Sequence, residues 1–314
     1  MKEWVVPLDY DGQRLDRFLK QQLPAVPHSF LARLARTGKL RVDKKRTSLN
    51  ARLKDGQHVT LYALFSENKE KSLSTRSSSR PLSSKDLQTF HRWIIYENDH
   101  FLAINKPMHV ATQGGAKVTH HVDAYLHHLN YVHQRSWKLV HRLDKDTSGV
   151  LLIAKNIQAA RILTKAFKDA AIEKTYWALT MGVPTPLIGE IKAPLLKKMI
   201  GGQELVVEDP QGDRAFTSYR VLDVAGRKAA LVELMPRTGR THQLRAHMLI
   251  LGTPILGDPK YKNDRVPIEN IPSTLHLHAA SLKMPDLFGG GPVTIEARPG
   301  ESFLKSCALL GFQV

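Results

Sequence analysis

The stretch Trp137-Lys138-Leu139-Val140-His141-Arg142-Leu143-Asp144-Lys145-Asp146-Thr147-Ser148-Gly149-Val150-Leu151-Leu152-Ile153-Ala154 has two apolar runs that flank a polar segment. The runs 137–140 and 150–154 predict strands, and Thr147-Ser148-Gly149 predicts the turn that opens the second strand. Asp144 is therefore expected on a loop held by two strands, where a side chain can be aimed into a cleft. A lone loop aspartate is usually solvated or caps a turn, so the carboxylate by itself establishes no function.

The composition indicates a polyanionic ligand. The formal charge is +17 at pH 7, and each phosphate neutralised by Lys or Arg releases counterions. Charge alone does not separate RNA from DNA or from an anionic membrane. The single cysteine, Cys307, excludes an intrachain disulfide and a cysteine-rich zinc site, and suits a reducing cytoplasm. No apolar run reaches membrane-spanning length and no signal-peptide core is evident, so we expect a soluble, cytoplasmic protein.

The chain is long enough for two domains. Residues 65–88 are rich in charge and serine with little to bury, which predicts a flexible linker. This linker separates a small domain, 1–64, from a larger one, 89–314.

The small domain is expected to contain two short amphipathic helices, around Leu15-Phe18-Leu19 and Phe30-Leu31-Leu34, followed by strands at 39–46 and 55–62. A charge run is usually only a solvated face. Here the basic residues interleave along a helix and the next strand, which would gather them in one patch. The segment from Gln13 through Gly56 resembles the S4-like RNA-binding domain, and this favours RNA contact by Arg33, Arg36, Lys39, Arg41, Lys44, Lys45 and Arg46.

The larger domain is predicted to be rich in strands joined by short turns. A hairpin is expected at 93–105, strands at 150–154, 174–181, 215–223 and 229–235, and helices near 157–169 and 241–251. This pattern favours an α+β fold with a mixed, largely antiparallel sheet over a doubly wound one. No GxGxxG motif or P-loop occurs, so no nucleotide cofactor is expected.

Three segments of the larger domain together resemble a known family. The stretch 141–149 resembles the HRLDxxTSG signature of the RluA-type pseudouridine synthases, 173–179 resembles their KxYxA segment, and 238–247 resembles their arginine helix. The resemblance spans nearly the whole chain and is greatest to members that modify large-subunit ribosomal RNA and carry an S4-like domain. It implies the family's catalytic fold with a central cleft.

The resemblance also implies roles for single residues. Asp144 corresponds to the catalytic aspartate, Tyr176 to a tyrosine that stacks on uracil and relays a proton, and Arg245 to an arginine that pairs with the aspartate. A bidentate guanidinium would keep Asp144 ionised and in one rotamer. Arg142 is implied to occupy the place that a flipped uridine leaves, and His141 and Arg240 are further predicted to bind RNA.

A metal site is not expected. His242 and His247 lack the i, i+4 spacing of a helical zinc site, and His276 and His278, predicted at strand positions, close no ligand set either.

The expected function is cofactor-free isomerisation of uridine to pseudouridine in RNA, by a monomer that acts on large-subunit ribosomal RNA or a ribosome assembly intermediate. Another structured RNA such as tRNA is an alternative substrate. A nucleoside or glycoside hydrolase would need a second carboxyl, for which Asp146 and Glu173 are nominal candidates. A non-catalytic S4-type RNA-binding protein is the remaining alternative.

Overall fold

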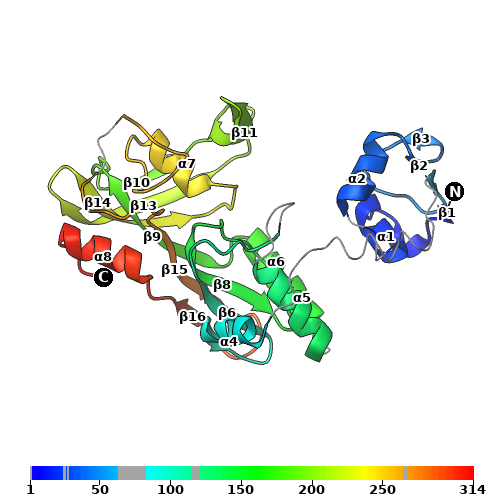
Figure 1. Cartoon of the computed structure of the whole chain (residues 1–314), viewed down its shortest axis with the longest axis horizontal. Coiled ribbons are helices and arrows are strands. Elements are labelled where there is room, and N and C mark those ends of the chain that lie inside the picture. The colour runs from blue at the N-terminus through cyan, green and yellow to red at the C-terminus, as the bar shows by residue number, and fades with distance from the viewer. Residues whose placement is uncertain are drawn as a thin grey trace. The chain divides into compact units, whose positions relative to one another are not determined.

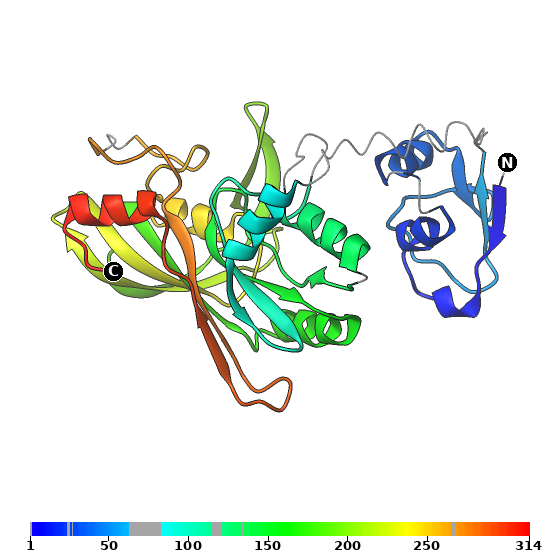
Figure 2. The same cartoon turned by 60° about the horizontal axis from the view of Figure 1, so that its bottom comes forward.

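The computed structural model describes residues 2–23, 26, 28–62, 83–114, 121–133, 135–264 and 268–314. The chain divides into two units, Met1–Ser79 and Arg80–Val314, drawn in Figures 1 and 2. The division falls inside the predicted linker, of which residues 65–82 lie outside the described ones. Residues 83–88 are not linker, which corrects the predicted boundary. A capping box between Ser83 and Asp86 starts helix α4 (Ser84–Arg92), and Phe90 of this helix is fully buried.

The N-terminal unit folds around one small core. Its helices lie on a four-stranded antiparallel sheet of order β1-β4-β2-β3. Leu15, Phe18 and Leu19 enter this core from the first helix and Leu31 and Leu34 from the second, as their spacing predicts. The elements are β1 (Lys2–Val5), the 3-10 helix η1 (Leu8–Tyr10), α1 (Leu15–Gln22), α2 (His28–Arg36), β2 (Leu40–Val42), β3 (Lys45–Arg46) and β4 (His58–Leu61).

The larger unit is built on one ten-stranded sheet. After α4, its elements are β5 (Ile94–Glu97), β6 (Phe101–Lys106), α5 (Val122–His133), β7 (Lys138–Leu139), β8 (Ser148–Ala154), α6 (Ile157–Lys168), β9 (Glu173–Met181), β10 (Ile188–Lys192), β11 (Leu195–Ile200), β12 (Gln203–Glu208), β13 (Phe216–Ala225), β14 (Ala229–Pro236), α7 (Gln243–Ile250), β15 (Leu277–Met284), β16 (Val293–Glu296) and α8 (Glu301–Leu310). Strands β11 and β12 form a separate hairpin.

The sheet is mixed and largely antiparallel, which confirms the predicted fold class. Its order is β10-β13-β14-β9-β15-β8-β6-β5, with β16 on β15 and β7 on β8. Among the described strands, β8 and β15 form the one parallel pair. This pair lies in the middle of the sheet, directly after the Asp144 loop.

Helices cover both faces of the sheet, as Figure 1 shows. Leu152 of β8 packs toward α6, whereas its neighbour Leu151 packs toward α4 and α5. In β9, Ala178 packs toward α7 and Leu179 toward α8. Successive strand residues point to opposite faces, so the continuous apolar run 150–154 is explained by a strand buried on both sides.

Several elements were not predicted. Strand β1 is short and mostly exposed, and the edge strand β10 has only Ile191 buried. In helices α5 and α8 the polar and apolar residues are poorly separated between the two faces, so the sequences show no clear 3.6-residue hydrophobic repeat. Within the described residues, no helix is both long and apolar enough to cross a membrane.

Candidate active site

The Asp144 loop meets β9 across a row of small residues. Ala279 of β15 pairs with Gly149 on one side and with Tyr176 on the other. Gly149 has φ +112°, and a Cβ at this position would overlap the backbone of Ala279. Only glycine allows this close parallel pairing. The sheet register therefore brings the end of the Asp144 loop opposite Tyr176.

The backbone is anchored on both sides of Asp144. The buried hydroxyl of Thr112 donates to the Leu143 carbonyl at 2.7 Å and accepts from the Leu143 N–H at 3.1 Å. On the other side, Nζ of Lys106 donates to the Lys145 carbonyl at 3.2 Å. These bonds hold the loop so that the carboxylate is presented without rearrangement of the backbone.

Lys106 is a fully buried lysine. Its Nζ also donates to the carbonyls of Pro107, at 2.8 Å, and Val110, at 2.7 Å, so three acceptors surround it. Burial lowers the pKa of Lys106 to about 7, and the carboxylates of Asp146 and Asp144 act against this shift. The lysine joins the segment after β6 to the Asp144 loop.

Strand β9 directs Tyr176 and Lys174 to the same side, because they are two residues apart. Nζ of Lys174 donates to the Thr238 carbonyl at 3.1 Å, and burial lowers its pKa. Burial, and then the Asp144 carboxylate, raise the pKa of Tyr176. The phenol is therefore neutral near pH 7 and suits stacking and proton relay.

Arg245 makes a bidentate pair, but with a different aspartate from the one implied by the family resemblance. Its Nε and Nη2 donate to the carboxylate of Asp258 at 2.6 and 2.7 Å, and both side chains are almost completely buried. Nη1 is 3.9 Å from Oδ2 of Asp144, an ion pair without the forked geometry. The expected fork to Asp144 is thus wrong for this structure, because Asp258 occupies two donors of the guanidinium.

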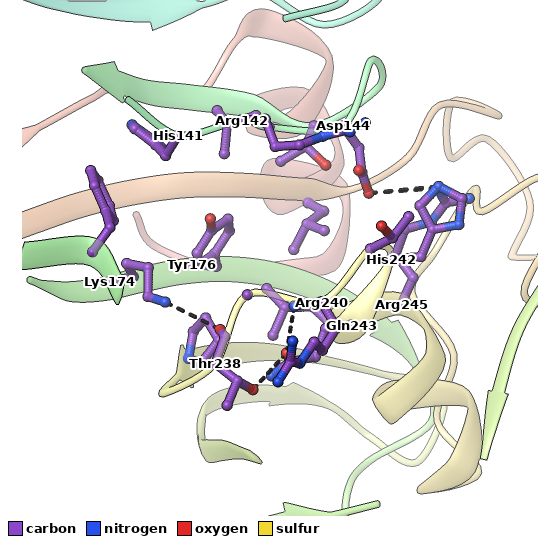
Figure 3. Close-up of a pocket in the computed structure, with 18 of the residues that line it drawn as sticks. His141, Arg142, Asp144, Lys174, Tyr176, Thr238, Arg240, His242, Gln243 and Arg245 are labelled. Atoms are coloured by element: carbon purple, nitrogen blue, oxygen red, sulfur yellow. Dashed lines mark hydrogen bonds and ion pairs between the residues drawn. The ribbon is translucent and has the colours of Figure 1, made fainter. Parts of the chain in front are cut away.

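His242 completes the surroundings of Asp144. Its Nε2 is 3.9 Å from Oδ2 of Asp144, the contact dashed in Figure 3. His242 stands directly before α7 in a left-handed conformation, φ 51° and ψ 19°. Burial lowers its pKa, with the Asp144 carboxylate opposing the shift.

Five of the residues described above line one pocket of about 610 Å³, a size typical of small-ligand sites: Asp144, Lys174, Tyr176, His242 and Arg245. Figure 3 shows Asp144, Tyr176 and Arg245 around it, with Thr238, Arg240 and Gln243 opposite the Asp144 loop. Asp144 is the one carboxylate among its described lining residues. Six lining side chains are cationic: Arg142, Lys168, Lys174, Arg237, Arg240 and Arg245. The pocket therefore suits a single nucleotide unit of an anionic polymer.

The three predicted RNA-binding residues of this domain all line the pocket. Arg142 is exposed at its rim. Arg240 donates from Nε to the Arg214 carbonyl at 3.1 Å. His141 stacks on Phe167, with centroids 4.3 Å apart, and its Nε2 accepts the Leu152 N–H at 2.8 Å. Burial lowers the pKa of His141 to about 3. Its neutral ring supports the pocket wall, and RNA contact by these three residues stays a prediction.

The other histidines discussed as possible metal ligands have protein partners. His247 is hydrogen-bonded to Thr217 and Ala193, and His276 to Leu256 and Ser306. His278, on β15, lies between Ser148 and the Ala297 carbonyl. His276 is one residue short of that strand, which corrects its predicted strand position.

The basic residues of the N-terminal unit span α2 to β3, as predicted. Six of the seven are exposed, and Arg41 is half-buried because its guanidinium donates to the carbonyls of Gly38 and Lys44. The Arg46 guanidinium lies against Gly38, at the end of α2. We call the seven residues the α2–β3 patch: Arg33, Arg36, Lys39, Arg41, Lys44, Lys45 and Arg46. That they form one RNA-binding surface stays a prediction.

Sequence reasoning missed several residues of the site. Lys174 and His242 lie inside the quoted motifs, one or two positions from residues that were selected, so their motif position was an available signal. Nothing in the sequence indicates what Lys106 and Asp258 contact. Thr112 carried no signal, because it is placed by a contact with a residue 31 positions away.

Comparison with known proteins gives concordant results. Residues 100–249 match the family described as RNA pseudouridylate synthase. A Rickettsia typhi protein named ribosomal large subunit pseudouridine synthase C is 36% identical over 91% of this chain and 93% of its own length. A Vibrio vulnificus protein of the same name is 36% identical over 97% and 95%. The structure of human RNA pseudouridylate synthase domain containing 4 superposes with a TM-score of 0.62 at 27% identity, covering 73% of this chain and 96% of that one.

Proposed function

The chain belongs to the RNA pseudouridylate synthase family, and from that premise we propose that it converts uridines of large-subunit ribosomal RNA to pseudouridine, with Asp144 as the reacting carboxylate. Asp144 is assigned as the reacting group because no other described carboxylate lines the pocket. It also faces Tyr176, and cations surround it.

The reaction breaks the bond from C1′ to N1 of the uracil, turns the base, and joins C5 to C1′. C5 loses its proton, and N1, freed from the sugar, gains one. Substrate and product contain the same atoms, so neither an oxidant nor a hydrolytic water is consumed. Asp144 can act by adding to C1′, by adding to C6, or by taking the 2′ proton. Each route requires an anion, and Arg245 and His242, both 3.9 Å from Oδ2, support that anion from one side.

Tyr176 is suited to hold the detached base. Its ring stands on the pocket side of β9 and can stack on uracil. Because its pKa is raised, the phenol keeps its proton and acts as a relay to another acceptor rather than as a phenolate base. The detached base must be kept in the pocket so that it rejoins its sugar rather than diffusing away.

A uridine must leave its stack to reach this pocket, at a cost of a few kcal/mol. Arg142 is exposed beside Asp144 and can fill the vacated position. The cationic rim offers charge to the neighbouring phosphates, since guanidinium groups bind phosphate with forked geometry.

Large-subunit ribosomal RNA is proposed as the substrate because the relatives that match almost the full chain are named for it. The α2–β3 patch supplies a second contact to the RNA backbone through its exposed cations. Action as a cytoplasmic monomer, on free RNA or an assembly intermediate, belongs to the same proposal.

A hydrolase with two carboxyls is disfavoured by the geometry. Asp146 is hydrogen-bonded to His109 at 2.9 Å and Glu173 is exposed, and neither lines the pocket. The general acid that such an enzyme needs has no candidate among the described lining residues.

The test is position-by-position mapping of pseudouridine in unmodified large-subunit ribosomal RNA treated with the purified protein. Asp144→Asn removes the proposed reacting group, and Asp169→Asn, an exposed aspartate at the end of α6, is the matched control. New pseudouridine with the wild type and the control alone is the expected result. The same assay is run with unmodified tRNA. Product with tRNA alone would make tRNA the substrate in place of ribosomal RNA. Tight binding of RNA with no product from either RNA would favour a non-catalytic RNA-binding protein.

A further inference from the structure

His242 lies between the Asp144 carboxylate and Tyr261, a buried tyrosine that is not among the pocket's lining residues. On one side its Nε2 is 3.9 Å from Oδ2 of Asp144. On the other, its Nδ1 is 2.9 Å from the hydroxyl oxygen of Tyr261. The two rings meet edge to face, with centroids 5.6 Å apart. One imidazole therefore connects the reacting group to the buried phenol.

The Tyr261 hydroxyl determines which nitrogen of His242 carries the proton. The backbone N–H of Val206, in β12, donates to the Tyr261 oxygen at 3.0 Å. Among the hydrogen bonds of the described residues, Nδ1 of His242 is the one acceptor that faces this hydroxyl, so we assign the Tyr261 proton to that contact. In a neutral imidazole the other nitrogen then bears the hydrogen. The network therefore directs Nε2–H toward Asp144, where at 3.9 Å it acts as a dipole on the carboxylate rather than as a hydrogen-bond donor.

The surroundings keep this ring neutral near pH 7, because burial lowers its pKa. Charged groups face it from each element packed against it. They are Asp144 from the loop, Arg245 from α7, Asp258 and Lys260 from the turn before Tyr261, and Glu204 from β12.

The backbone of His242 supports a requirement for its side chain. The residue has φ 51°, in the left-handed region that glycine adopts without strain and that side-chain-bearing residues disfavour. Strained positions of this kind gather at functional sites. Glycine would suit the turn better, yet the position holds an imidazole that points at the carboxylate (Figure 3).

We propose that His242 is a positioning residue, whose Nε2–H holds the Asp144 carboxylate in the orientation that meets the flipped uridine. The inference rests on the proposed function. Tyr261 acts through His242 by selecting its tautomer. Asp258 acts through Tyr261, since its Oδ1 accepts the Tyr261 N–H at 3.0 Å. The relay runs from the backbone of β12 to the reacting group.

The first experiment is His242→Gly in the full chain. Glycine relieves the left-handed backbone, so the folded state is retained while the imidazole is lost. We expect kcat to fall about 10- to 100-fold, less than the loss of a typical oxyanion donor, with KM changed less than about 2-fold. Added imidazole should restore part of kcat, because the vacated site opens to the pocket. Asn270→Gly, at an exposed position with φ 63° outside the pocket, controls for the backbone change.

The second experiment tests the order of the relay. Tyr261→Phe keeps the ring that packs under the Arg245 guanidinium, 4.9 Å away, but removes the hydroxyl. We expect a smaller fall in kcat than for His242→Gly. The double variant should lose no more than His242→Gly alone, because both changes act on one path. If the fold-losses in kcat of the two single variants multiply in the double variant, Tyr261 does not act through His242.

Two results would overturn the proposal: wild-type kcat in His242→Gly, or a loss that imidazole does not restore and that accompanies a lower unfolding midpoint. A readout independent of turnover is the tautomer of His242, observed by nitrogen NMR and assigned by comparison with His242→Gly. A proton on Nε2 is expected, and a proton on Nδ1 instead would refute the network. If the wild-type protein makes no pseudouridine but His242 shows the expected tautomer, the proposed function fails while the hydrogen-bond network of His242 is retained.

Discussion

Two aspartates approach the Arg245 guanidinium, and their regions differ in how far the carboxylate is satisfied. Asp258 is fully buried and accepts two bonds from Arg245 and two from the backbone N–H groups of Lys260 and Tyr261. Asp144 is 21% exposed, and Nη1 of Arg245 and Nε2 of His242 are each 3.9 Å from its Oδ2. A saturated carboxylate holds structure, whereas an unsaturated one on an anchored loop keeps its oxygens for a substrate.

The comparison is most directly tested at Asp144. Asp144→Asn should reduce pseudouridine formation by at least about 10³-fold, near the upper range for loss of one catalytic group. Its unfolding midpoint should match the wild type, because no hydrogen bond within the described residues depends on this carboxylate. Single-turnover assays and thermal unfolding measure the two effects. A large loss of stability would mean that the Asp144 carboxylate has a structural role in the fold.

The opposite behaviour is expected at Asp258. Asp258→Asn leaves the buried Arg245 guanidinium without its counter-ion, which should destabilise the fold by about 3–5 kcal/mol. Denaturant unfolding measures the loss, and Asp169→Asn serves as a surface control that should leave the curve unchanged. An Asp258→Asn protein of wild-type stability would remove the distinction between the two aspartates.

Lys106, which holds the Asp144 loop through the Lys145 carbonyl, allows a test by pH. Its folded pKa is about 7, below the ordinary value of 10.5. Between these values the unfolded chain binds the proton and the folded chain releases it, so stability should rise with pH by up to about 1.4 kcal/mol per unit. Lys106→Met should abolish this part of the slope and lower kcat by loosening the loop. Unfolding curves from pH 7 to 10 for both proteins provide the measurement, and parallel curves would refute it.

The smallest effect is expected at the α2–β3 patch, whose charges are mostly exposed. Replacing Arg33, Arg36, Lys45 and Arg46 by Gln should flatten the dependence of log K on log salt by about 0.7–0.9 for each lost phosphate contact. A charge-matched control replaces the exposed Arg227, Lys228, Lys283 and Lys305. Equal flattening in both proteins would indicate net charge rather than a patch.

Much of the fold was predictable because burial patterns are local. Leu15, Phe18 and Leu19 repeat at helical spacing, and the run 150–154 is apolar throughout, so α1 and β8 could be located from neighbouring residues alone. The predicted linker boundary was wrong at 83–88, because the serine and charged residues there resemble linker composition. Leu87 and Phe90 nevertheless pack helix α4 against the core.

The sequence by itself determined the two-part organisation, the mixed sheet and the family, and it identified Asp144, Tyr176 and Arg245 as pocket residues. Only the tertiary structure decided that Arg245 forks to Asp258, that Thr112 and Lys106 hold the loop, and that His242 faces the carboxylate. The physical reason is range. Secondary structure follows from spacing within a few residues, whereas a hydrogen bond is made or lost within about 1 Å between groups that the whole fold brings together.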